Sequence, residues 1–434
     1  MSQQPGEILA QSRMGTMQIV AVALCVLLNA LDGFDVLSIS FAAPGIAEEW
    51  NITRGALGVV LSMELIGMAV GSVLLGRTAD LIGRRPTIQL CLIVMVAGMF
   101  LVPFANGLTE LSAYRLMTGL GIGGMLASIN AMAAEYSNAR WRTLAVTVMA
   151  AGYPLGAIVG GSISSVLLAQ FDWRAIFFFG GAVTALFLPL VSMLLPESIE
   201  YLDRRRPSGA LERINKTLTR MGHATVSRLA DIPESTDAKG FRQLFSPALA
   251  RITVLLTVAY FAHIMTFYFI LKWIPKIVVD LGYAPSLAGG VLVAANIGGM
   301  AGSLLLGLLS VRFNTRWLVI GALGLAFVTV TYFGLGQATL GQLALVSAVA
   351  GFCTNSAVVG LYALFVQSFP TEVRASGTGF AIGMGRGGAA LGPILAGFLF
   401  ETGFGLSTVA LIMASGSLVA MVALLMLGRP RAAA

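Results

Sequence analysis

Twelve apolar stretches, each about as long as a bilayer is thick, run through this sequence of 434 residues. A membrane-spanning helix needs roughly 20 mainly apolar residues. The stretches lie at residues 17–46, 55–76, 87–105, 109–135, 143–169, 174–195, 248–273, 286–310, 316–336, 340–367, 375–400 and 404–428. Backbone groups must be paired internally in lipid, and a helix pairs them within one segment. The sequence therefore predicts an all-α membrane protein with twelve transmembrane helices.

The composition supports this class. The chain is 57% hydrophobic and 11% charged, whereas soluble domains carry about 25% charged residues. The pI of 9.6 fits Lys and Arg in loops that face anionic lipid, so we expect no nucleic-acid partner. The sequence has no nucleophile–base spacing, no phosphate-binding loop and no metal-ligand cluster. We therefore expect neither an enzyme nor a bound cofactor or metal.

A polar segment at residues 196–247 separates the first six stretches from the last six. It predicts an N-terminal half at 1–195, a cytoplasmic central loop at 196–247 and a C-terminal half at 248–434. Within the loop, apolar residues recur at helical spacing between basic ones: Leu211, Ile214, Leu218 and Met221. This pattern is typical of a short helix on the membrane surface. A solvated linker is the alternative, and the sequence does not decide between them.

The distribution of Lys and Arg predicts the orientation of the chain. Loops on the side of the N-terminus hold most of these basic residues. They include Arg84, Arg85 and the Lys and Arg residues of the central loop. The opposite side holds four: Arg54, Arg174, Lys272 and Lys276. Because positive charge accumulates in cytoplasmic loops, we expect both termini in the cytoplasm.

The two sets of six stretches repeat. Residues 71–76 (GSVLLG) match residues 302–307 (GSLLLG), and the same register places Asp32 on His263. This repeat predicts two six-helix halves related by an axis along the membrane normal. In such transporters substrate binds near the midplane between the halves, and rocking of the halves alternates access to it.

Asp32 and Asp35 are the only charges in the stretch 17–46. A carboxylate at the bilayer centre costs about 2.5–3.5 kcal/mol on insertion scales, and residues three apart share one face of a helix. The pair is our candidate for proton coupling. Alternatively, one of them holds two helices together by pairing with Arg115. Glu64 is a further intramembrane acid, and could bind an Arg, bind substrate or take a second proton.

Three intramembrane basic residues are candidates for contact with a carboxylate. Arg386 lies near the middle of the eleventh stretch, where a guanidinium needs an anion or a cavity, and its planar fork suits a carboxylate. Arg115 lies in the fourth stretch, and could take part in coupling or pair with Asp35. His263 lies about midway along the seventh stretch and could donate to a carboxylate. A structural pair is the alternative for each.

Several motifs resemble those of a known family. Residues 76–86 (GRTADLIGRRP) resemble the loop 2–3 signature of the major facilitator superfamily, and Pro196-Glu197-Ser198 is typical of it. Residues 32–35 (DGFD), 152–156 (GYPLG) and 383–387 (GMGRG) are similar to elements of its aromatic acid:proton symporters. The resemblance covers essentially the whole chain. It implies a proton-coupled importer of an aromatic carboxylate in a bacterial inner membrane.

This resemblance adds expectations about residues. An aromatic substrate favours aromatic and polar contacts, and the candidates are Phe34, Tyr153, Tyr260, Tyr362 and Asn296. The loop signature implies a charge latch that stabilises one conformational state, made of Gly76, Asp80, Gly83, Arg84 and Arg85. We expect Glu135 to serve the same end with Arg140 and Arg142.

Two alternatives stay open at this point. The chain could import another organic anion by the same proton logic. Export or antiport is disfavoured, because Ala157 stands where antiporters of the superfamily carry Pro in the fifth helix. We expect a monomer, driven by the proton gradient.

Overall fold

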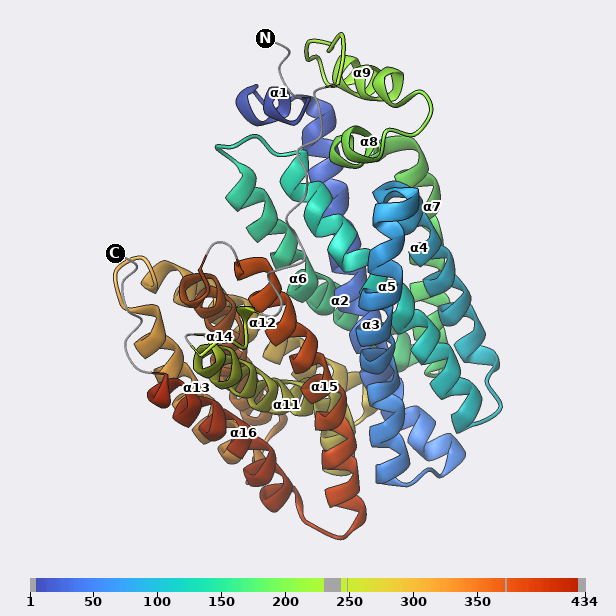
Figure 1. Ribbon diagram of the computed structural model, residues 1–434. Helices are drawn as coiled ribbons and strands as arrows, with labels where there is room; N and C mark the ends of the chain where they lie inside the picture. Colours follow the sequence, from blue (N-terminus) through green and yellow to red (C-terminus); the bar gives the residue numbers. More distant parts are fainter. Residues whose placement is uncertain (1–4, 230–242, 248, 371–372, 428–434) are drawn as a thin grey trace. The chain divides into compact units, whose positions relative to one another are not determined.

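The computed structural model describes residues 5–229, 243–247, 249–370 and 373–427. Within this part of the chain, twelve helices are long and apolar enough to cross a membrane, as predicted (Figure 1). They are α2 (Thr16–Trp50), α3 (Arg54–Ile82), α4 (Arg84–Leu101), α5 (Leu108–Glu135), α6 (Arg142–Gln170), α7 (Arg174–Leu194), α11 (Ala250–Asp280), α12 (Pro285–Leu309), α13 (Thr315–Gly334), α14 (Leu340–Ser368), α15 (Arg374–Glu401) and α16 (Leu406–Met426).

Most helix ends fall close to the predicted stretches, and two differences matter. α3 continues to Ile82 and stops at Gly83, whose φ of 106° favours glycine. α11 continues to Asp280. Lys272, which was counted with the charges on the side opposite the N-terminus, therefore lies well inside a helix and is completely buried. The predicted stretch ends earlier than the helix, because a buried Lys lowers the mean hydropathy of a segment as much as an exposed Lys does.

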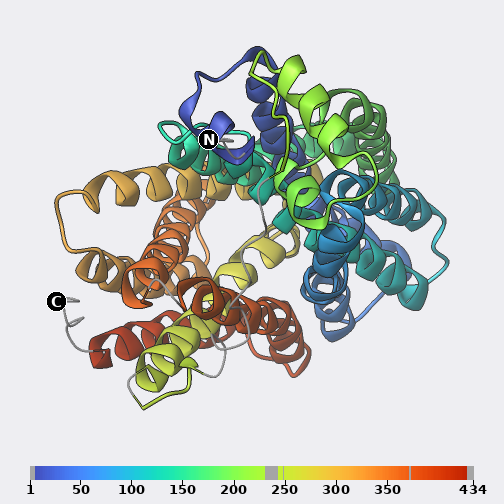
Figure 2. The same ribbon diagram turned by 45° about the horizontal axis from the view of Figure 1, so that its top comes forward.

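Three short helices, α1 (Pro5–Gln11), α8 (Ile199–Arg205) and α9 (Ala210–Arg220), lie beside one another near the start of α2 (Figures 1 and 2). A 3₁₀ turn, η1 (Val102–Phe104), follows α4. The apolar residues of α9 form the predicted helical face, but Ile214, Leu218 and Met221 are buried against protein. Neither a membrane-surface helix nor a solvated linker describes this segment.

A hydrogen-bond chain connects the segment after α9 to the long helices. His223 Nε2 lies 2.9 Å from Gln18 Oε1, and Gln18 Nε2 donates to the carbonyl of Tyr136 at 3.0 Å. Because Gln18 is on α2 and Tyr136 follows α5, part of the central segment is fixed to the N-terminal helices.

The chain forms two compact units. Unit 1 comprises residues 1–36, 67–157 and 177–235, and unit 2 comprises residues 37–66, 158–176 and 236–434. Helices α2, α3, α6 and α7 thus contribute one part to each unit. The division of the sequence into two halves and a central loop remains a prediction, since a compact unit is defined by packing and a half by repetition.

Glycine allows close helix packing in unit 1. A Cβ atom on Gly156 of α6 would lie 1.7 Å from the carbonyl oxygen of Ala30 on α2, and one on Gly33 would lie 2.0 Å from the carbonyl oxygen of Tyr153. Small residues at helix crossings in membranes permit such backbone contact. The glycine within the DGFD element is therefore required by the neighbouring main chain.

In unit 2, α11 packs on α15 and α16, and α12 and α13 pack on α14. A glycine face of α15 approaches the main chain of α11, where a Cβ on Gly388 would lie 2.4 Å from the carbonyl oxygen of Phe261. This packing places Arg386 and Tyr260, which lie on these two helices, close to each other.

Candidate functional site

Asp32 and Asp35 are both buried in unit 1, with exposed fractions of 1% and 0%. Asp35 faces α7, since a Cβ on Gly180 would lie 3.5 Å from its Oδ1 atom. Asp32 is close enough to Cys91 of α4 to interact electrostatically. Two acids in an apolar helix bundle are costly when both are charged, so this pair is well suited to hold a proton.

Arg115 of α5 reaches the same region and is completely buried. Its Nη2 donates to the main-chain carbonyl of Asp35 at 2.8 Å, and its Nη1 to Met99 Sδ at 3.2 Å. The guanidinium also lies 5.4 Å from the ring centroid of Phe177. Arg115 thus contacts Asp35 through its main chain, and the predicted pairing with its carboxylate stays a prediction. Arg115 therefore fixes the course of α2 beside the acids.

Two predicted aromatic residues also belong to unit 1. Phe34 is buried and stacks edge-on against Phe179, with ring centroids 5.7 Å apart. Tyr153 is half-buried, and its carbonyl contacts Gly33. Phe34 lies between the two acids on α2. Tyr153, on α6, approaches the same part of α2 through its main chain.

A second cluster forms in unit 2 around Arg386. The hydroxyl groups of Tyr260 and Tyr362 lie 2.9 Å apart and their ring centroids 5.6 Å apart. Arg386 interacts electrostatically with both tyrosines. Next to it, Gly385 leaves room for the Tyr260 ring, because a Cβ there would lie 2.1 Å from a ring carbon. Arg386 is half-buried and Tyr362 is 38% exposed, so the cluster is accessible.

His263 is completely buried in unit 2, and protein groups occupy both ring nitrogens. Nε2 lies 2.9 Å from the carbonyl of Thr354, and Nδ1 lies 3.0 Å from the hydroxyl of Ser417. A carbonyl only accepts, so Nε2 carries hydrogen. His263 thus joins α11 to α14 and α16. Asn296 donates to the carbonyl of Leu292 in its own helix. Substrate contact by a ring nitrogen of His263 would first require one of its bonds to break.

Glu64 has an ion-pair partner that the sequence did not suggest. Its Oε2 lies 3.7 Å from Lys272 Nζ, and both side chains have an exposed fraction of 0%. Lys272 lies at the edge of its predicted stretch, and the sequence offered Arg115 and Arg386 as the candidate partners of Glu64.

The loop signature forms a dense polar network in unit 1. Glu197, just after α7, accepts hydrogen bonds through Oε1 from the backbone N–H groups of Arg84, Arg85 and Ser198 at 3.0, 3.2 and 2.8 Å. The first N–H groups of a helix lack partners within the helix, and here Glu197 supplies one to α4. Burial raises the pKa of the Glu197 carboxyl, whereas these donors act in the opposite direction.

Arg84 carries the charge pairs of this network. It binds Glu135 at 2.5 Å and Glu200 at 3.1 Å. The expected partners of Glu135 were Arg140 and Arg142, and this expectation is wrong for Arg142, which donates to the carbonyl of Ala134. The cause is the position of Glu135 at the last turn of α5, where it faces the beginning of α4.

The other predicted latch residues play backbone roles. The carbonyl of Asp80 accepts from Arg205 Nε at 2.8 Å, and Arg85 donates to the carbonyl of Ser192. A Cβ on Gly83 would lie 2.3 Å from Glu197 Oε2, whereas one on Gly76 would have nothing within 4 Å. Packing therefore explains the glycine at position 83 and leaves the one at position 76 without an explanation.

Glu197→Ala is expected to lower the thermal stability of the purified protein. The change leaves three N–H groups without their acceptor, at about 1–3 kcal/mol for each one that water does not reach. Melting in detergent, followed by the loss of monodisperse protein, measures the effect. Glu200→Gln is the control, because Glu200 is 43% exposed in its pair with Arg84 and surface ion pairs contribute little. Equal melting of the two variants would contradict this role of Glu197.

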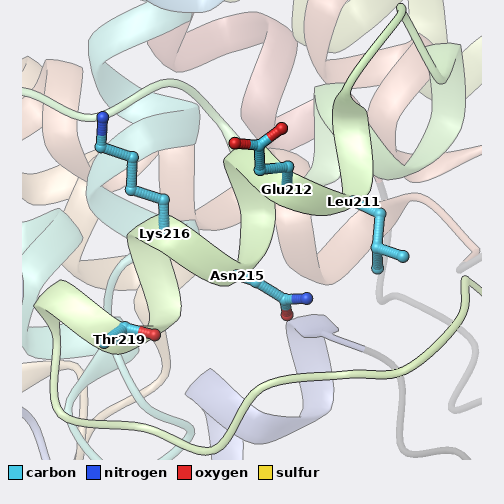
Figure 3. A pocket seen from close by; sticks show the side chains of 5 residues that line it. All are labelled: Leu211, Glu212, Asn215, Lys216 and Thr219. Carbon is cyan, nitrogen blue, oxygen red and sulfur yellow. The ribbon is translucent and has the colours of Figure 1, made fainter.

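The outer side of α9 carries an open pocket lined by Leu211, Glu212, Asn215, Lys216 and Thr219 (Figure 3). All five residues belong to one helix, and most of their side chains are exposed or half-buried. This pocket is a surface feature far in sequence from the acid pair and from Arg386.

Comparison with known proteins identifies the family of this chain. The sequence model of the Major Facilitator Superfamily matches residues 25–310 and 256–434. The chain belongs to the major facilitator superfamily. It is therefore a multi-pass membrane transporter and not an enzyme, and the resemblance of its loop signature is confirmed.

Two relatives and one solved structure illustrate the similarity. The chain is 30% identical to a gallate transporter of Pseudomonas putida, over 95% of this chain and 92% of the relative. It is 31% identical to the 4-hydroxybenzoate transporter PcaK of Acinetobacter baylyi, over 85% of this chain and 82% of the relative. The xylose transporter XylE from E. coli, in a partially occluded inward open conformation, matches with a TM-score of 0.74 at 16% identity, over 96% of this chain and 99% of that one. The last likeness concerns the fold alone.

Proposed function

We propose that this transporter imports a small aromatic carboxylate across the bacterial inner membrane together with protons, by alternating access. The observation that carries the proposal is the accessible cluster of Arg386 with Tyr260 and Tyr362 in unit 2. The names of the relatives that transport gallate and 4-hydroxybenzoate support the same class of substrate. We propose that the chain works as a monomer with both termini in the cytoplasm, without a cofactor.

The cluster has the chemistry that an aromatic acid requires. A guanidinium presents parallel N–H groups that match a carboxylate, and it is costly in a membrane until an anion meets it. The tyrosine rings offer faces and edges for the aromatic ring of the substrate. Their hydroxyl groups both donate and accept, so they can bind a ring hydroxyl of the substrate.

The acid pair supplies the coupling in this proposal. Asp32 and Asp35 are buried on one helix, where a proton removes the cost of one negative charge. Arg115 and Phe34 hold this part of α2 in place. Glu64, a third candidate for coupling, has Lys272 as its ion-pair partner, and we assign it a different role below.

Uptake of labelled acids by cells that express the chain tests the proposal. The panel contains benzoate, 4-hydroxybenzoate, protocatechuate, vanillate and one aliphatic dicarboxylate, each with and without a protonophore. Accumulation of an aromatic acid that the protonophore abolishes is the expected result. Accumulation of the aliphatic acid alone would favour another organic anion, and activity only as efflux would favour export. Either of these outcomes would overturn the proposal.

Arg386→Lys is expected to weaken substrate binding about tenfold, because a point charge replaces a bidentate fork. The half-saturation constant for counterflow, in which labelled substrate exchanges with unlabelled substrate, measures this effect without the proton gradient. Arg312→Lys is the matched control, since Arg312 is exposed between α12 and α13. An unchanged constant for Arg386→Lys would exclude the role of Arg386 in holding the carboxylate.

A further inference from the structure

The Glu64–Lys272 ion pair lies deep within unit 2. At about 1.5 Å per residue, Glu64 lies about 15 Å along α3 from Arg54, and Lys272 about 12 Å along α11 from Asp280. The pair is therefore close to the middle of a hydrocarbon core about 30 Å thick. Neither side chain is exposed. Each charge needs the other there, because a single buried charge is strongly unfavourable.

Between this pair and the helix ends, α3 is packed tightly against α15 and α11. A Cβ on Gly58 would lie 2.5 Å from the carbonyl oxygen of Pro393 and 3.2 Å from the Cα of Gly397. Trp273, the neighbour of Lys272, is buried, donates to the carbonyl of Pro393 at 3.2 Å and packs on Phe400. Backbone contact and aromatic side chains thus join this part of α3 to α15 and α11.

A second ion pair joins the same two helices at their ends. Arg54 Nη2 lies 3.0 Å from Asp280 Oδ2, and the two side chains are 45% and 28% exposed. The contact between α3 and α11 is thus held by one exposed and one buried pair, with the packed layer between them. In the orientation proposed above, the exposed pair lies on the outer side of the membrane.

We propose that Glu64 and Lys272 are gating residues, and that their ion pair holds the outer part of α3 closed against α11 and α15. α3 belongs to the first six helices, and α11 and α15 to the last six. Entry of substrate from outside requires these sets to separate, and water then replaces each partner. The pair favours closure only while both charges are present. This inference deepens the proposed function, on which it rests for the meaning of opening.

The gate is tested with Ser62→Cys as a reporter. Ser62 is buried and lies one turn from Gly58, on the face of α3 that packs on α15. The reporter is labelled in intact cells with a maleimide that does not cross membranes, and the chain without the reporter gives the background of the buried native cysteines. Glu64→Gln removes the carboxylate that pairs with the buried Lys272 charge, so we expect labelling to become about tenfold faster.

Matched variants distinguish the effect of losing the buried ion pair from a general weakening of the contact between the helices. Arg54→Gln removes the exposed pair between the same helices, and we expect less than about a threefold change. The double variant Glu64→Gln/Lys272→Gln removes the attraction and also the single buried charge, so we expect it to label more slowly than Glu64→Gln but faster than the unchanged pair. If Glu64→Gln yields no folded protein, the exchange variant Glu64→Lys/Lys272→Glu replaces it and is expected to label slowly.

The outcomes decide between the gate and a purely local pair. Unchanged labelling of folded Glu64→Gln, or fast labelling of the exchange variant, would overturn the inference. Labelling needs no substrate, so the result stands apart from the uptake panel. If labelling behaves as expected and no aromatic acid accumulates, the gate holds and the substrate proposal fails.

Discussion

We expect Asp32→Asn to abolish accumulation of substrate against its gradient and to leave exchange of substrate across the membrane in place. An amide has nearly the shape of a protonated carboxyl group, so the variant mimics a proton that never leaves. Exchange requires no net proton movement, whereas uphill uptake does. Accumulation of labelled substrate in energised cells and counterflow in vesicles without a gradient measure the two activities separately.

Two variants delimit this result. Asp172→Asn, at an exposed position that is 60% accessible in its pair with Arg174, should accumulate substrate normally. Asp35→Asn then shows whether the second acid is also required. Normal accumulation by Asp32→Asn would rule out Asp32 as the coupling residue, and loss of both accumulation and counterflow would indicate damage to the fold.

Gly156→Val should yield almost no folded protein. Its side chain would have to occupy the space of the Ala30 main chain, since a Cβ alone would lie 1.7 Å from the carbonyl oxygen. A main chain cannot give way like a flexible side chain, so the helices must separate. Overpacking in cores costs about 1–3 kcal/mol and at times more, and separating two helices belongs to the upper end. The yield of monodisperse protein and its melting temperature measure the effect.

Gly290→Ala in α12 is the control for this change. A Cβ at that position would have nothing within 4 Å, and Ala favours a helix over Gly by about 1 kcal/mol. Its yield should equal or exceed that of the unchanged chain. Normal folding of Gly156→Val would mean that α2 and α6 do not approach each other as closely as described.

The twelve helices could be predicted from the sequence because the bilayer imposes one length and one polarity on every span. Sequence reasoning placed α3, α11 and α9 least well. In α11 the apolar stretch ended at residue 273, whereas the helix continues to Asp280. In α9 the apolar face was visible, but the surface that covers it comes from distant parts of the chain, which no local pattern reveals.

In the candidate site, too, single residues could be predicted from the sequence but their partners could not. That Asp32, Asp35 and Arg386 are unusual follows from the cost of charge in a membrane, which acts on each residue alone. Partners depend on helix rotation and packing. Glu64 therefore has an ion-pair partner, Lys272, that its position in the sequence does not suggest, and Glu135 pairs with Arg84 and not with Arg142. The Pro196-Glu197-Ser198 motif was noticed, but its action on the first turn of α4 was not.

The crossing of α2 and α6 has a mechanical consequence. Gly33 and Gly156 place main chain directly against main chain, so the contact contains no rotamers that could rearrange. Interfaces of long side chains can deform in small steps by changing χ angles, and this crossing cannot. Movement there is confined to tilting or sliding of whole helices about a fixed pivot. Because Asp32 and Asp35 are next to that pivot on α2, any such rotation reorients both carboxyl groups at once.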